Sequence, residues 1–478
     1  MQRPLSFAPF VLGLALLVSL PVVSNSSANA AEAGKPNIIL IMADDMGYEC
    51  VTANGGESYK TPNLDKLAAT GMRFEHCYSQ PICTPSRVQI MTGMYNSRNY
   101  VRFGLLQPGS TTFGNLFRDD GYATCVVGKW QLDGGFQGPG GFGFDDYCLW
   151  QLTRRPNRYA NPGLEINREE IDFRDGQYGP DIVSDHACSF IRQRAEADKP
   201  FFLYYPMILP HWPFEPTPDS AEWDPTFRRD DKKEISNKGT DNKYFADMVT
   251  YTDKMVGKIV AQLDEAGVRD NTLILFTGDN GTYSAITSRF QGRDWKGGKG
   301  HMMDNGTHVT LIANMPGTVP AGAVNLDLVD FSDILPTLCQ MADISVPRSL
   351  ALDGHSFAPQ LRGEPNPNPR PYVYCWYFRN GKPVLNSKQH SAGESARTKQ
   401  YKLYLDGGFY DVTQDFYETE PLNESELTDE QRAKQKMLGE TITRFTREGF
   451  YEQSSKEPKS RKKSKKKSNK KKKEAESA

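Results

Sequence analysis

The chain has 478 residues, of which 38% are hydrophobic and 24% are charged, and its formal net charge is −2. This length and apolar content favour one large domain with a smaller partner, and they exclude a small disulfide-stapled scaffold or a wholly disordered chain. The eight cysteines are Cys50, Cys77, Cys83, Cys125, Cys148, Cys188, Cys339 and Cys375. They lack the spacing of a disulfide framework, so we predict that most of them are small buried side chains.

Residues 1–30 have the pattern of a secretory signal peptide. Arg3 precedes an apolar stretch over residues 7–23, and Ala28-Asn29-Ala30 forms a small-x-small cleavage site. A retained membrane helix is the alternative, but the stretch contains two prolines and lacks a stop-transfer flank. We therefore predict cleavage near Ala30 and export to the periplasm, the cell surface or the medium.

Residues 31–370 alternate buried strands with helices. Helices are predicted from Pro62 to about Gly71, over residues 243–266 and over residues 327–341. This alternation predicts an α/β domain in which helices cover both faces of a large, mostly parallel sheet. Continuous apolar runs predict its fully buried strands at residues 36–43, 123–127, 201–207, 271–277 and 309–314.

The composition changes near residue 371. Short aromatic strands followed by an acidic helix predict a small antiparallel subdomain over residues 371–452: strands at 371–378, 401–405 and 408–412, and a helix at 428–447. Residues 453–478 form a Lys-rich tail that is predicted to be disordered. Twelve Lys/Arg and one Glu between Lys456 and Lys473 give a net charge of +11, which leaves −13 for the rest of the chain.

Acidic side chains follow two of the predicted strands directly. Asp44 and Asp45 come after the first strand, and Asp279 and Asn280 come after the strand at 271–277. Capping of the next turn is the simpler interpretation of each pair alone. Ligands gather at the carboxyl ends of strands in open α/β sheets, however, and two adjacent carboxylates repel each other unless a cation lies between them. Together the pairs predict an all-oxygen site for calcium or magnesium.

The stretch Cys-Thr-Pro-Ser-Arg at residues 83–87 raises a separate question, because Cys83 stands just ahead of a helix opened by Pro85. A disulfide half, a metal ligand and a free nucleophile are three possible roles, although a thiolate is too soft for the oxygen site. The N–H groups at a helix start bind anions, and the forked donor of Arg87 suits sulfate or phosphate. Cys83 is therefore placed to touch both a metal ion and a bound oxyanion.

Three further basic side chains lie beyond candidate strand ends or on a loop leading into a strand. They are Lys129 in GKWQL, His211 in LPHWPFEP and Lys299 in WKGGKG. Each alone is more often a solvated lysine or a loop histidine. Taken with Arg87, they predict a cage around one tetrahedral anion held against the metal ion.

The chain resembles the type I, formylglycine-dependent sulfatases of the alkaline phosphatase superfamily from residue 35 to about residue 447. The resemblance rests on ordered motifs: PNIILIMADDMG, CTPSR followed by TG, GKW, PHWPF, TGDNG, GGKG and DVTQDFYETEPLN. It implies an alkaline phosphatase-like fold, with the catalytic domain over residues 31–370. It also implies that a maturation enzyme oxidises Cys83 to formylglycine (3-oxoalanine), whose hydrate is the nucleophile.

The resemblance also assigns the other site residues. Arg87 would steady the hydrate, and calcium, or magnesium, would be held by Asp44, Asp45, Cys83, Asp279 and Asn280. The sulfate would be bound, and the leaving alcohol stabilised, by Lys129, His211 and Lys299. These assignments imply nucleophilic catalysis assisted by a metal ion and by fixed positive charge.

Two positions depart from the family pattern. Gln131, a predicted substrate-binding residue, occupies the position of a histidine that is usual in the family. That histidine helps to deprotonate the second hydroxyl of the hydrate. Glutamine is not a base near neutral pH. Either turnover slows, or another group such as His301 or His308 takes this role. Residues 305–308, Asn-Gly-Thr-His, replace the usual Gly-Gly-x-Arg and remove an arginine contact.

These observations favour an exported sulfatase acting on sulfate esters of a sulfated carbohydrate. A phosphomonoester or phosphodiester hydrolase of the same superfamily is the first alternative. A non-catalytic binder of sulfated glycans is the second, motivated by Gln131 and by the basic tail. No nucleic-acid partner is expected, because the chain is predicted to be exported and its excess positive charge lies in the tail alone.

The basic tail is either a solvated end or a tether to polyanions such as a sulfated polysaccharide. If it is a tether, deletion of residues 456–478 will weaken salt-sensitive retention on a polyanionic matrix, because screened charge attraction is lost. Hydrolysis of small esters will stay unchanged. Column retention of the full and truncated proteins at several salt concentrations measures this, and equal retention would contradict the tether.

Overall fold

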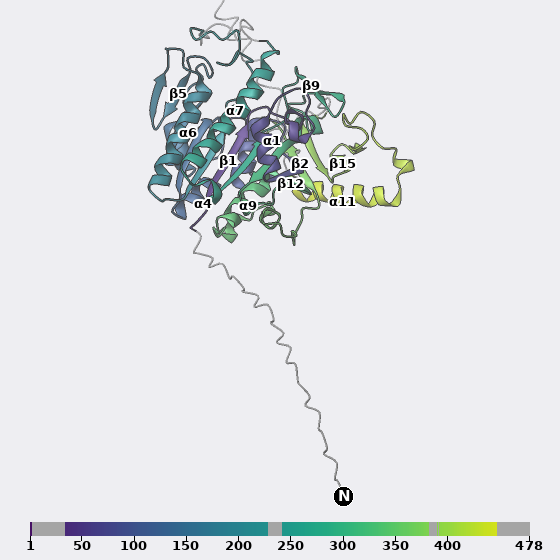
Figure 1. Cartoon of the computed structure of the whole chain (residues 1–478). Coiled ribbons are helices and arrows are strands. Elements are labelled where there is room, and N and C mark those ends of the chain that lie inside the picture. The colour runs from purple at the N-terminus through teal and green to yellow at the C-terminus, as the bar shows by residue number, and fades with distance from the viewer. Residues whose placement is uncertain (2–33, 228–240, 382–389, 391, 447–478) are drawn as a thin grey trace, which may run out of the picture. The chain divides into compact units, whose positions relative to one another are not determined.

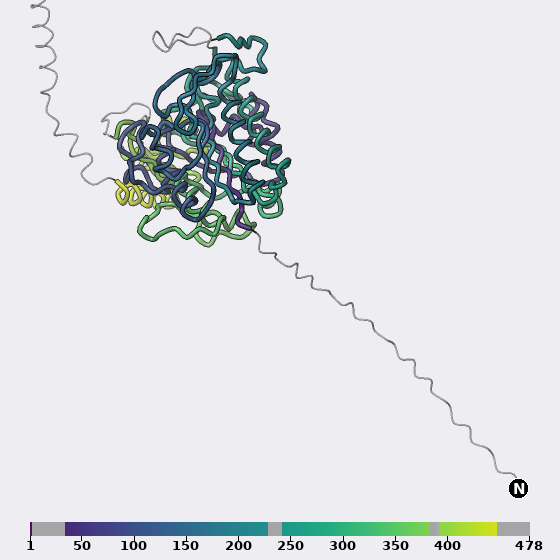
Figure 2. The backbone as a smooth tube through the Cα atoms, turned by 90° about the vertical axis from the view of Figure 1, so that its left-hand side faces the viewer, coloured from purple at the N-terminus to yellow at the C-terminus, as the bar shows by residue number. Residues whose placement is uncertain are grey.

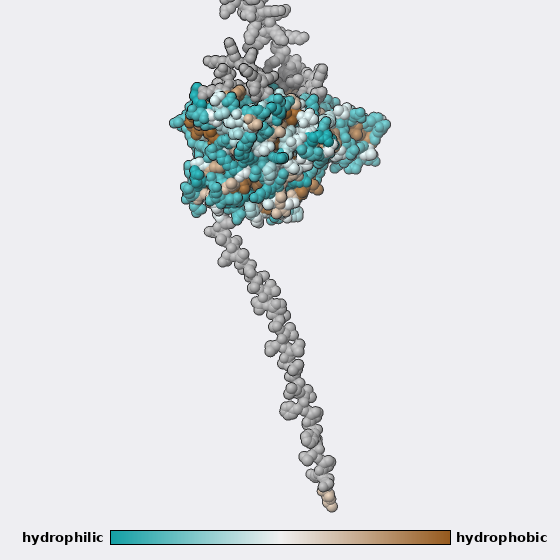
Figure 3. Space-filling model, turned by 45° about the horizontal axis from the view of Figure 1, so that its top comes forward, coloured by the Kyte–Doolittle hydropathy of each residue, from teal (hydrophilic) through white to brown (hydrophobic). Residues whose placement is uncertain are grey.

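The computed structural model describes Met1 and residues 34–227, 241–381, 390 and 392–446. The predicted signal peptide, apart from Met1, and the Lys-rich tail lie outside these residues. In the part that is described, no helix is long and apolar enough to cross a membrane. On the face drawn in Figure 3, apolar side chains are scattered in small groups among hydrophilic ones.

The main sheet is mixed but mostly parallel, as predicted. Its ten strands run in the order β12-β2-β11-β8-β1-β7-β3-β4-β5-β6. Strand β11 is antiparallel to β8 and to β2, and β5 and β6 form an antiparallel edge. The bounds are β1 Asn37–Ala43, β2 Met72–Tyr78, β3 Ala123–Lys129, β4 Asp146–Trp150, β5 Gly163–Ile166, β6 Glu169–Asp172, β7 Phe201–Pro206, β8 Thr272–Gly278, β11 His308–Asn314 and β12 Ala323–Asp330.

Strand β1 lies in the middle of this sheet, between β7 and β8. Its seven residues are all buried, because successive side chains point to opposite faces and helices cover both. Leu40 and Met42 face the cluster under helices α2 (Cys83–Thr92), α4 (Phe113–Asp119) and α9 (Ile334–Met341). Ile39 and Ile41 face α1 (Pro62–Ala69), α6 (Gly179–Glu196) and α7 (Tyr244–Glu265) (Figure 1). The predicted sandwich of helices around a sheet is confirmed.

One predicted helix was partly wrong. Residues 327–330, expected to open a helix that runs to 341, belong to strand β12, which pairs in parallel with β2. The helical part begins only after Asp330, whose side chain accepts a hydrogen bond from the Ser332 backbone and caps a short 3₁₀ turn, Phe331–Asp333, ahead of α9. Edge pairing with β2 satisfies the backbone here, so it overrides the apolar spacing that favoured a helix.

The C-terminal part forms a four-stranded antiparallel sheet in the order β13-β14-β15-β16. Its strands are β13 Val373–Tyr377, β14 Gly393–Arg397, β15 Tyr401–Tyr404 and β16 Phe409–Asp411, and helix α11 spans Asp429–Phe445. The helix lies beside these strands at the yellow end of the tube in Figure 2. Strand β14 was not predicted, because its sequence GESAR lacks apolar alternation. Tyr374 and Trp376 of β13 join the hydrophobic cluster of the main sheet.

The remaining elements are short. A two-stranded ribbon pairs β9 Thr287–Phe290 with β10 Arg293–Lys296 ahead of the loop that carries Lys299. Within the described residues there are also short one-turn helices: α3 Asn96–Asn99, α5 Gly138–Gly141, α8 Asp304–Thr307 and α10 Ala358–Leu361. All eight cysteines are buried and unpaired, which confirms the prediction made from their spacing.

Candidate active site

The register of β1 with β8 brings the two acidic pairs together. Ala43 lies opposite Gly278, so the residues that follow each strand leave the sheet side by side. The Asp45 N–H donates to Asp279 Oδ1 at 3.0 Å, and Asn280 Nδ2 donates to Asp45 Oδ1 at 2.9 Å. Asp45 turns the chain with a φ of 65°, in the left-handed region that non-glycine residues rarely adopt. We call Asp44, Asp45, Asp279 and Asn280 the carboxylate cluster, and all four are fully buried.

Helix α2 places Cys83 and Arg87 on this cluster. Cys83 is its first residue, and the helix stops at Gly93, whose φ of 66° suits glycine. Arg87, one turn further on, is 1% exposed. Its Nη1 donates to the Lys129 carbonyl at 3.0 Å, and its Nη2 contacts Asp279 Oδ2 at 3.3 Å. The predicted proximity of the CTPSR segment to the acidic pairs is therefore present.

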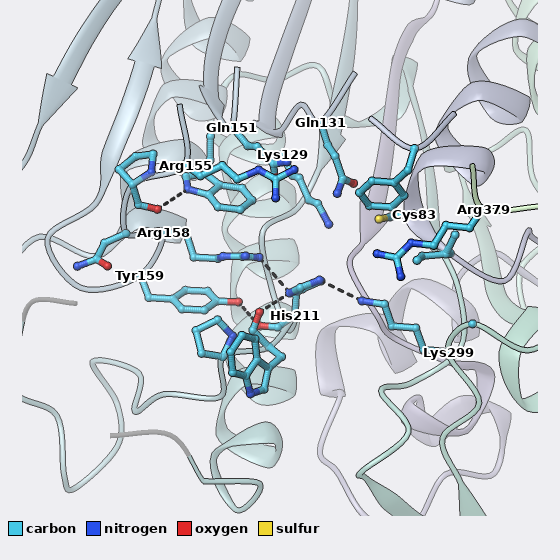
Figure 4. A pocket seen from close by; sticks show the side chains of 18 of the residues that line it. Cys83, Lys129, Gln131, Gln151, Arg155, Arg158, Tyr159, His211, Lys299 and Arg379 are labelled. Carbon is cyan, nitrogen blue, oxygen red and sulfur yellow. Dashed lines mark hydrogen bonds between the residues drawn. The ribbon is translucent and has the colours of Figure 1, made fainter. Parts of the chain in front are cut away.

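Lys129, His211 and Lys299, the basic trio, come from three separate parts of the chain. Lys129 is the last residue of β3 rather than a loop residue, and its Nζ donates to Asp44 Oδ2 at 2.7 Å. Lys299 Nζ donates to Asp45 Oδ2 at 2.6 Å and lies 3.0 Å from His211 Nε2. Figure 4 shows the three side chains on the same pocket as Cys83.

Burial and close charges set the protonation of these groups. Burial alone raises the pKa of Asp44, but the positive charges of Lys129, Arg87 and Lys299 outweigh it and hold that pKa well below its usual range. Burial and the neighbouring Asp44 raise the pKa of Asp279 to about 7, despite Arg87. Burial, with Lys299 next, lowers the pKa of His211 well below its usual value, so its imidazole is neutral.

The same burial makes Cys83 a poor nucleophile as a cysteine. Desolvation raises the pKa of its thiol, and Asp279 and Asp44 add to this effect while Lys129 opposes it. A thiol attacks only as a thiolate, and this site keeps it protonated near neutral pH. A different chemical group at position 83 is needed if this residue is to react.

The carboxylate cluster fits a hard divalent cation. Asp44 Oδ1 and Asn280 Oδ1 are buried acceptors without a hydrogen-bond partner among the described residues. Such orphaned oxygens are costly unless a cation or a donor reaches them. His211 offers a ring nitrogen within 4.8 Å of Asp44 and Asp45. Calcium and magnesium prefer oxygen to nitrogen, so the four oxygen donors of the cluster suit them better.

Cys83, Gln131 and the basic trio line one pocket of about 880 Å³. Gln131 has a φ of 58°, and its Oε1 is buried without a hydrogen-bond partner. Sequence reasoning missed other lining residues, above all Arg155, Arg158 and Arg379. They lie in loops after β4 and β13, where no spacing or periodicity marks them.

Neither histidine that was considered as a substitute for the usual family histidine lines this pocket. His308 stacks on Tyr48 and Tyr78, with ring centroids 4.0 and 5.0 Å away, and its Nε2 lies 2.9 Å from the Glu75 carbonyl. Burial lowers its pKa to about 4. His308 is thus a core side chain, and the structure gives no support to it as the missing base.

This fold and site define a hydrolase of the alkaline phosphatase superfamily, and comparison with known proteins identifies the family. A model described as "Sulfatase" matches residues 36–344, and one described as "N-sulphoglucosamine sulphohydrolase, C-terminal" matches residues 295–446. The chain belongs to the sulfatase family and is a sulfuric ester hydrolase of the arylsulfatase type. The resemblance drawn from the sequence motifs is confirmed.

Individual relatives agree with this assignment. The chain is 28% identical to arylsulfatase G of Mus musculus over 81% of its own length and 79% of the relative. It is 28% identical to N-acetylgalactosamine-6-sulfatase of Canis lupus familiaris over 73% of its length and 70% of the relative. Among solved structures, Ps i-CgsB in complex with k-i-k-neocarrahexaose superposes with a TM-score of 0.70 at 27% identity, covering 86% of this chain and 93% of that one.

The contacts of Arg87 predict a large structural effect. Arg87→Ala should lower the free energy of unfolding by about 3–5 kcal/mol, because it leaves the buried Asp279 carboxylate without its guanidinium partner. Chemical denaturation at about pH 9, where a carboxyl group with a pKa of about 7 is ionised, measures this. The exposed pair Arg102–Asp133 provides the control, and Arg102→Ala should cost about 1 kcal/mol or less. Equal losses in the two variants would contradict the role assigned to Arg87.

Proposed function

We propose that the protein is an exported sulfatase that hydrolyses sulfate esters of a carbohydrate through a formylglycine hydrate made from Cys83. The observation that carries the proposal is the position of Cys83. It lies at the start of α2, in one pocket with the basic trio, and its thiol is coupled to the charges of Asp44 and Asp279. Family membership supports sulfate-ester hydrolysis, and the signal-like N-terminus motivates export.

Two observations favour a carbohydrate as the alcohol part of the substrate. The family description that matches residues 295–446 and the name of the relative from Canis lupus familiaris both refer to amino-sugar sulfates. The pocket volume lies within the range of roughly 300–1,000 Å³ that small-molecule sites occupy. Its walls include the partly exposed rings of Phe103 and Trp212, which offer apolar surface to a sugar ring.

The first chemical step follows from the positions of the charged donors. One hydroxyl of the hydrate at position 83 gives its proton to the Asp279 carboxylate and attacks the sulfur. A new S–O bond forms, and the bond between sulfur and the ester oxygen breaks. Lys129 and Lys299 place N–H donors beside the attacked group, where they stabilise the charge that develops on its oxygens. Lys299, in contact with the neutral His211, is the charged donor from which the leaving alkoxide takes a proton.

A divalent cation in the carboxylate cluster would lower the pKa of the attacking hydroxyl. Asp44, Asp45, Asp279 and Asn280 are the residues that would hold it. Arg87 keeps Asp279 in place through its Nη2 contact and fixes the end of β3 through the Lys129 carbonyl. The chain therefore orients the cluster from both sides before substrate arrives.

The second step restores the aldehyde. The remaining hydroxyl gives its proton to water or to the departing sulfate, its oxygen forms the C=O bond, and the bond from the same carbon to the sulfate oxygen breaks. Gln131 does not accept this proton as a base, but its free Oε1 accepts a hydrogen bond from the hydroxyl. We therefore assign Gln131 to orienting the hydroxyl and expect the release of sulfate to be the slower step.

The decisive experiment joins a mass measurement to an assay. Protein from the native host should yield the tryptic peptide FEHCYSQPICTPSR, residues 74–87, with formylglycine at position 83 and cysteine at position 77. The same protein should release sulfate from a sulfated saccharide faster than phosphate from the matched phosphate ester. Cys83→Ala should abolish hydrolysis, whereas Cys188→Ala, a change of another buried cysteine on α6, should leave it intact.

Two outcomes would contradict the proposal. Faster cleavage of phosphate esters would favour the phosphohydrolase alternative. Unmodified Cys83 in a host that matures other sulfatases, with glycan binding but no sulfate release, would favour the non-catalytic binder.

Removal of metal ions tests the carboxylate cluster. Chelation should abolish hydrolysis, and added calcium or magnesium should restore it, because clustered buried carboxylates bind a hard cation strongly. Asp44→Ala should prevent the recovery, while Asp219→Ala, in an exposed ion pair with Lys254, should not. Full activity in protein that elemental analysis finds free of divalent metal would exclude the cation site.

A further inference from the structure

The pocket carries more positive charge than one sulfate group needs. Arg155, Arg158 and Arg379, here called the arginine rim, line it together with the basic trio. Lys129 and Lys299 each have a carboxylate partner in the carboxylate cluster. No residue of the rim forms an ion pair with a carboxylate anywhere in the described parts of the chain.

Aromatic faces and one amide position the rim instead. The Arg158 guanidinium lies 3.8 Å from the Trp150 ring centroid, and its Nη1 is 3.0 Å from His211 Nδ1. The Arg379 guanidinium lies 5.0 Å from the Phe103 ring centroid. Stacking holds the plane of a guanidinium and leaves the N–H groups along its edge as donors.

Arg155 is held by a side-chain amide. With the Gln151 amide turned so that its oxygen faces Arg155, that oxygen accepts hydrogen bonds from Arg155 Nε and Nη2 at 3.0 and 2.8 Å. The amide is neutral, so the charge of Arg155 remains uncompensated by this contact. Figure 4 shows Arg155 and Arg158 on one side of the pocket and Arg379 on the opposite side, next to Cys83.

Among the described residues, the acidic side chains of the pocket wall do not balance this charge. Glu215 is the one carboxylate of the described lining, is 6% exposed, and already has an interaction of its own. A sulfate monoester carries one negative charge, which the basic trio receives. Three arginines around the same volume therefore favour a ligand with further negative charge.

We propose that the arginine rim binds a second anionic group of the substrate, a carboxylate or a further sulfate on the saccharide that carries the scissile ester. This inference rests on the proposed function and narrows it from sulfated carbohydrates to polyanionic ones. Arg158 contacts His211, which belongs to the basic trio, so its replacement would also disturb the binding of the scissile sulfate. Among the described residues, neither Arg155 nor Arg379 has a hydrogen bond or ion pair to the carboxylate cluster or the basic trio, so they are the positions at which the inference is tested.

The test compares three saccharides that carry the same sulfate ester. One has no other charge, one has a neighbouring carboxylate, and one has a second sulfate. The wild-type protein should show a kcat/KM about tenfold or more higher for at least one of the doubly charged saccharides, mainly through KM, because charge-assisted hydrogen bonds to arginine strengthen binding. The preferred one identifies whether the second group is a carboxylate or a sulfate. Higher salt should reduce the advantage.

Arg155→Gln and Arg379→Gln should remove most of this advantage and leave the rate on the singly charged saccharide unchanged. Arg102→Gln, at an exposed arginine paired with Asp133 outside the pocket wall, is the matched control and should preserve it. Equal rates on all three saccharides in the wild type, or equal losses on all three in the variants, would overturn the inference.

A binding measurement distinguishes failure of the arginine-rim inference from failure of the proposed function. The affinities of the three saccharides for the Cys83→Ala protein, measured by calorimetry, do not depend on turnover. Tighter binding of a doubly charged saccharide that requires Arg155 or Arg379 supports the rim even if no ester is hydrolysed. Equal affinities would overturn the rim even in an active sulfatase.

Discussion

The repulsion among Asp44, Asp45 and Asp279 is the constraint on which this site depends. The three carboxylates are fully buried beyond the C-terminal ends of the central strands β1 and β8, where water does not screen them. Charged side chains from three distant segments compensate them. Arg87 on α2 contacts Asp279, Lys129 on β3 contacts Asp44, and Lys299 on a loop contacts Asp45. These ion pairs connect the ends of β1 and β8 to helix α2, which carries Cys83, and to the segments of Lys129 and Lys299.

This compensation gives the lysines two tasks. An ammonium group has three donors, and the contacts seen here between Lys129 or Lys299 and the carboxylates use only part of that capacity. The remaining donors of Lys129 and Lys299 are available to the oxygens of a bound ester. On the proposed function, the charges that offset the repulsion within the buried cluster would therefore also bind the sulfate of the scissile ester.

Local sequence predicted this cluster well because strand ends are local features. The run before Asp44 and the run before Asp279 read as buried strands, and parallel pairing brought their ends together. Strand β12 was mistaken because leucines and isoleucines continue past its end at helical spacing. Pairing with β2 decides its conformation, and that pairing is not encoded within the segment itself.

The arginine rim shows the opposite case. Its three arginines lie in irregular loops: Arg155, Arg158 and Arg379. Each contacts an aromatic ring or an amide, and no sequence motif indicates these contacts. Their shared pocket exists only after β4 and β13 are in place. Sequence therefore indicated the proposed reaction better than the substrate. Most of the proposed reacting groups lie at strand ends, at a helix start or in a motif, whereas the arginines of the rim lie in loops without a motif.

Gln131 connects the two parts of the site. It lies two residues beyond Lys129, in a left-handed conformation that turns its side chain into the pocket, and its Oε1 is buried without a donor. Burying an acceptor without a partner is unfavourable, so a donor from water or from a bound molecule would complete this contact. On the proposed mechanism, a hydrate at position 83 would supply such a donor through its hydroxyl. Glutamine would then orient the group from which the proton departs, and water or the sulfate itself would take that proton.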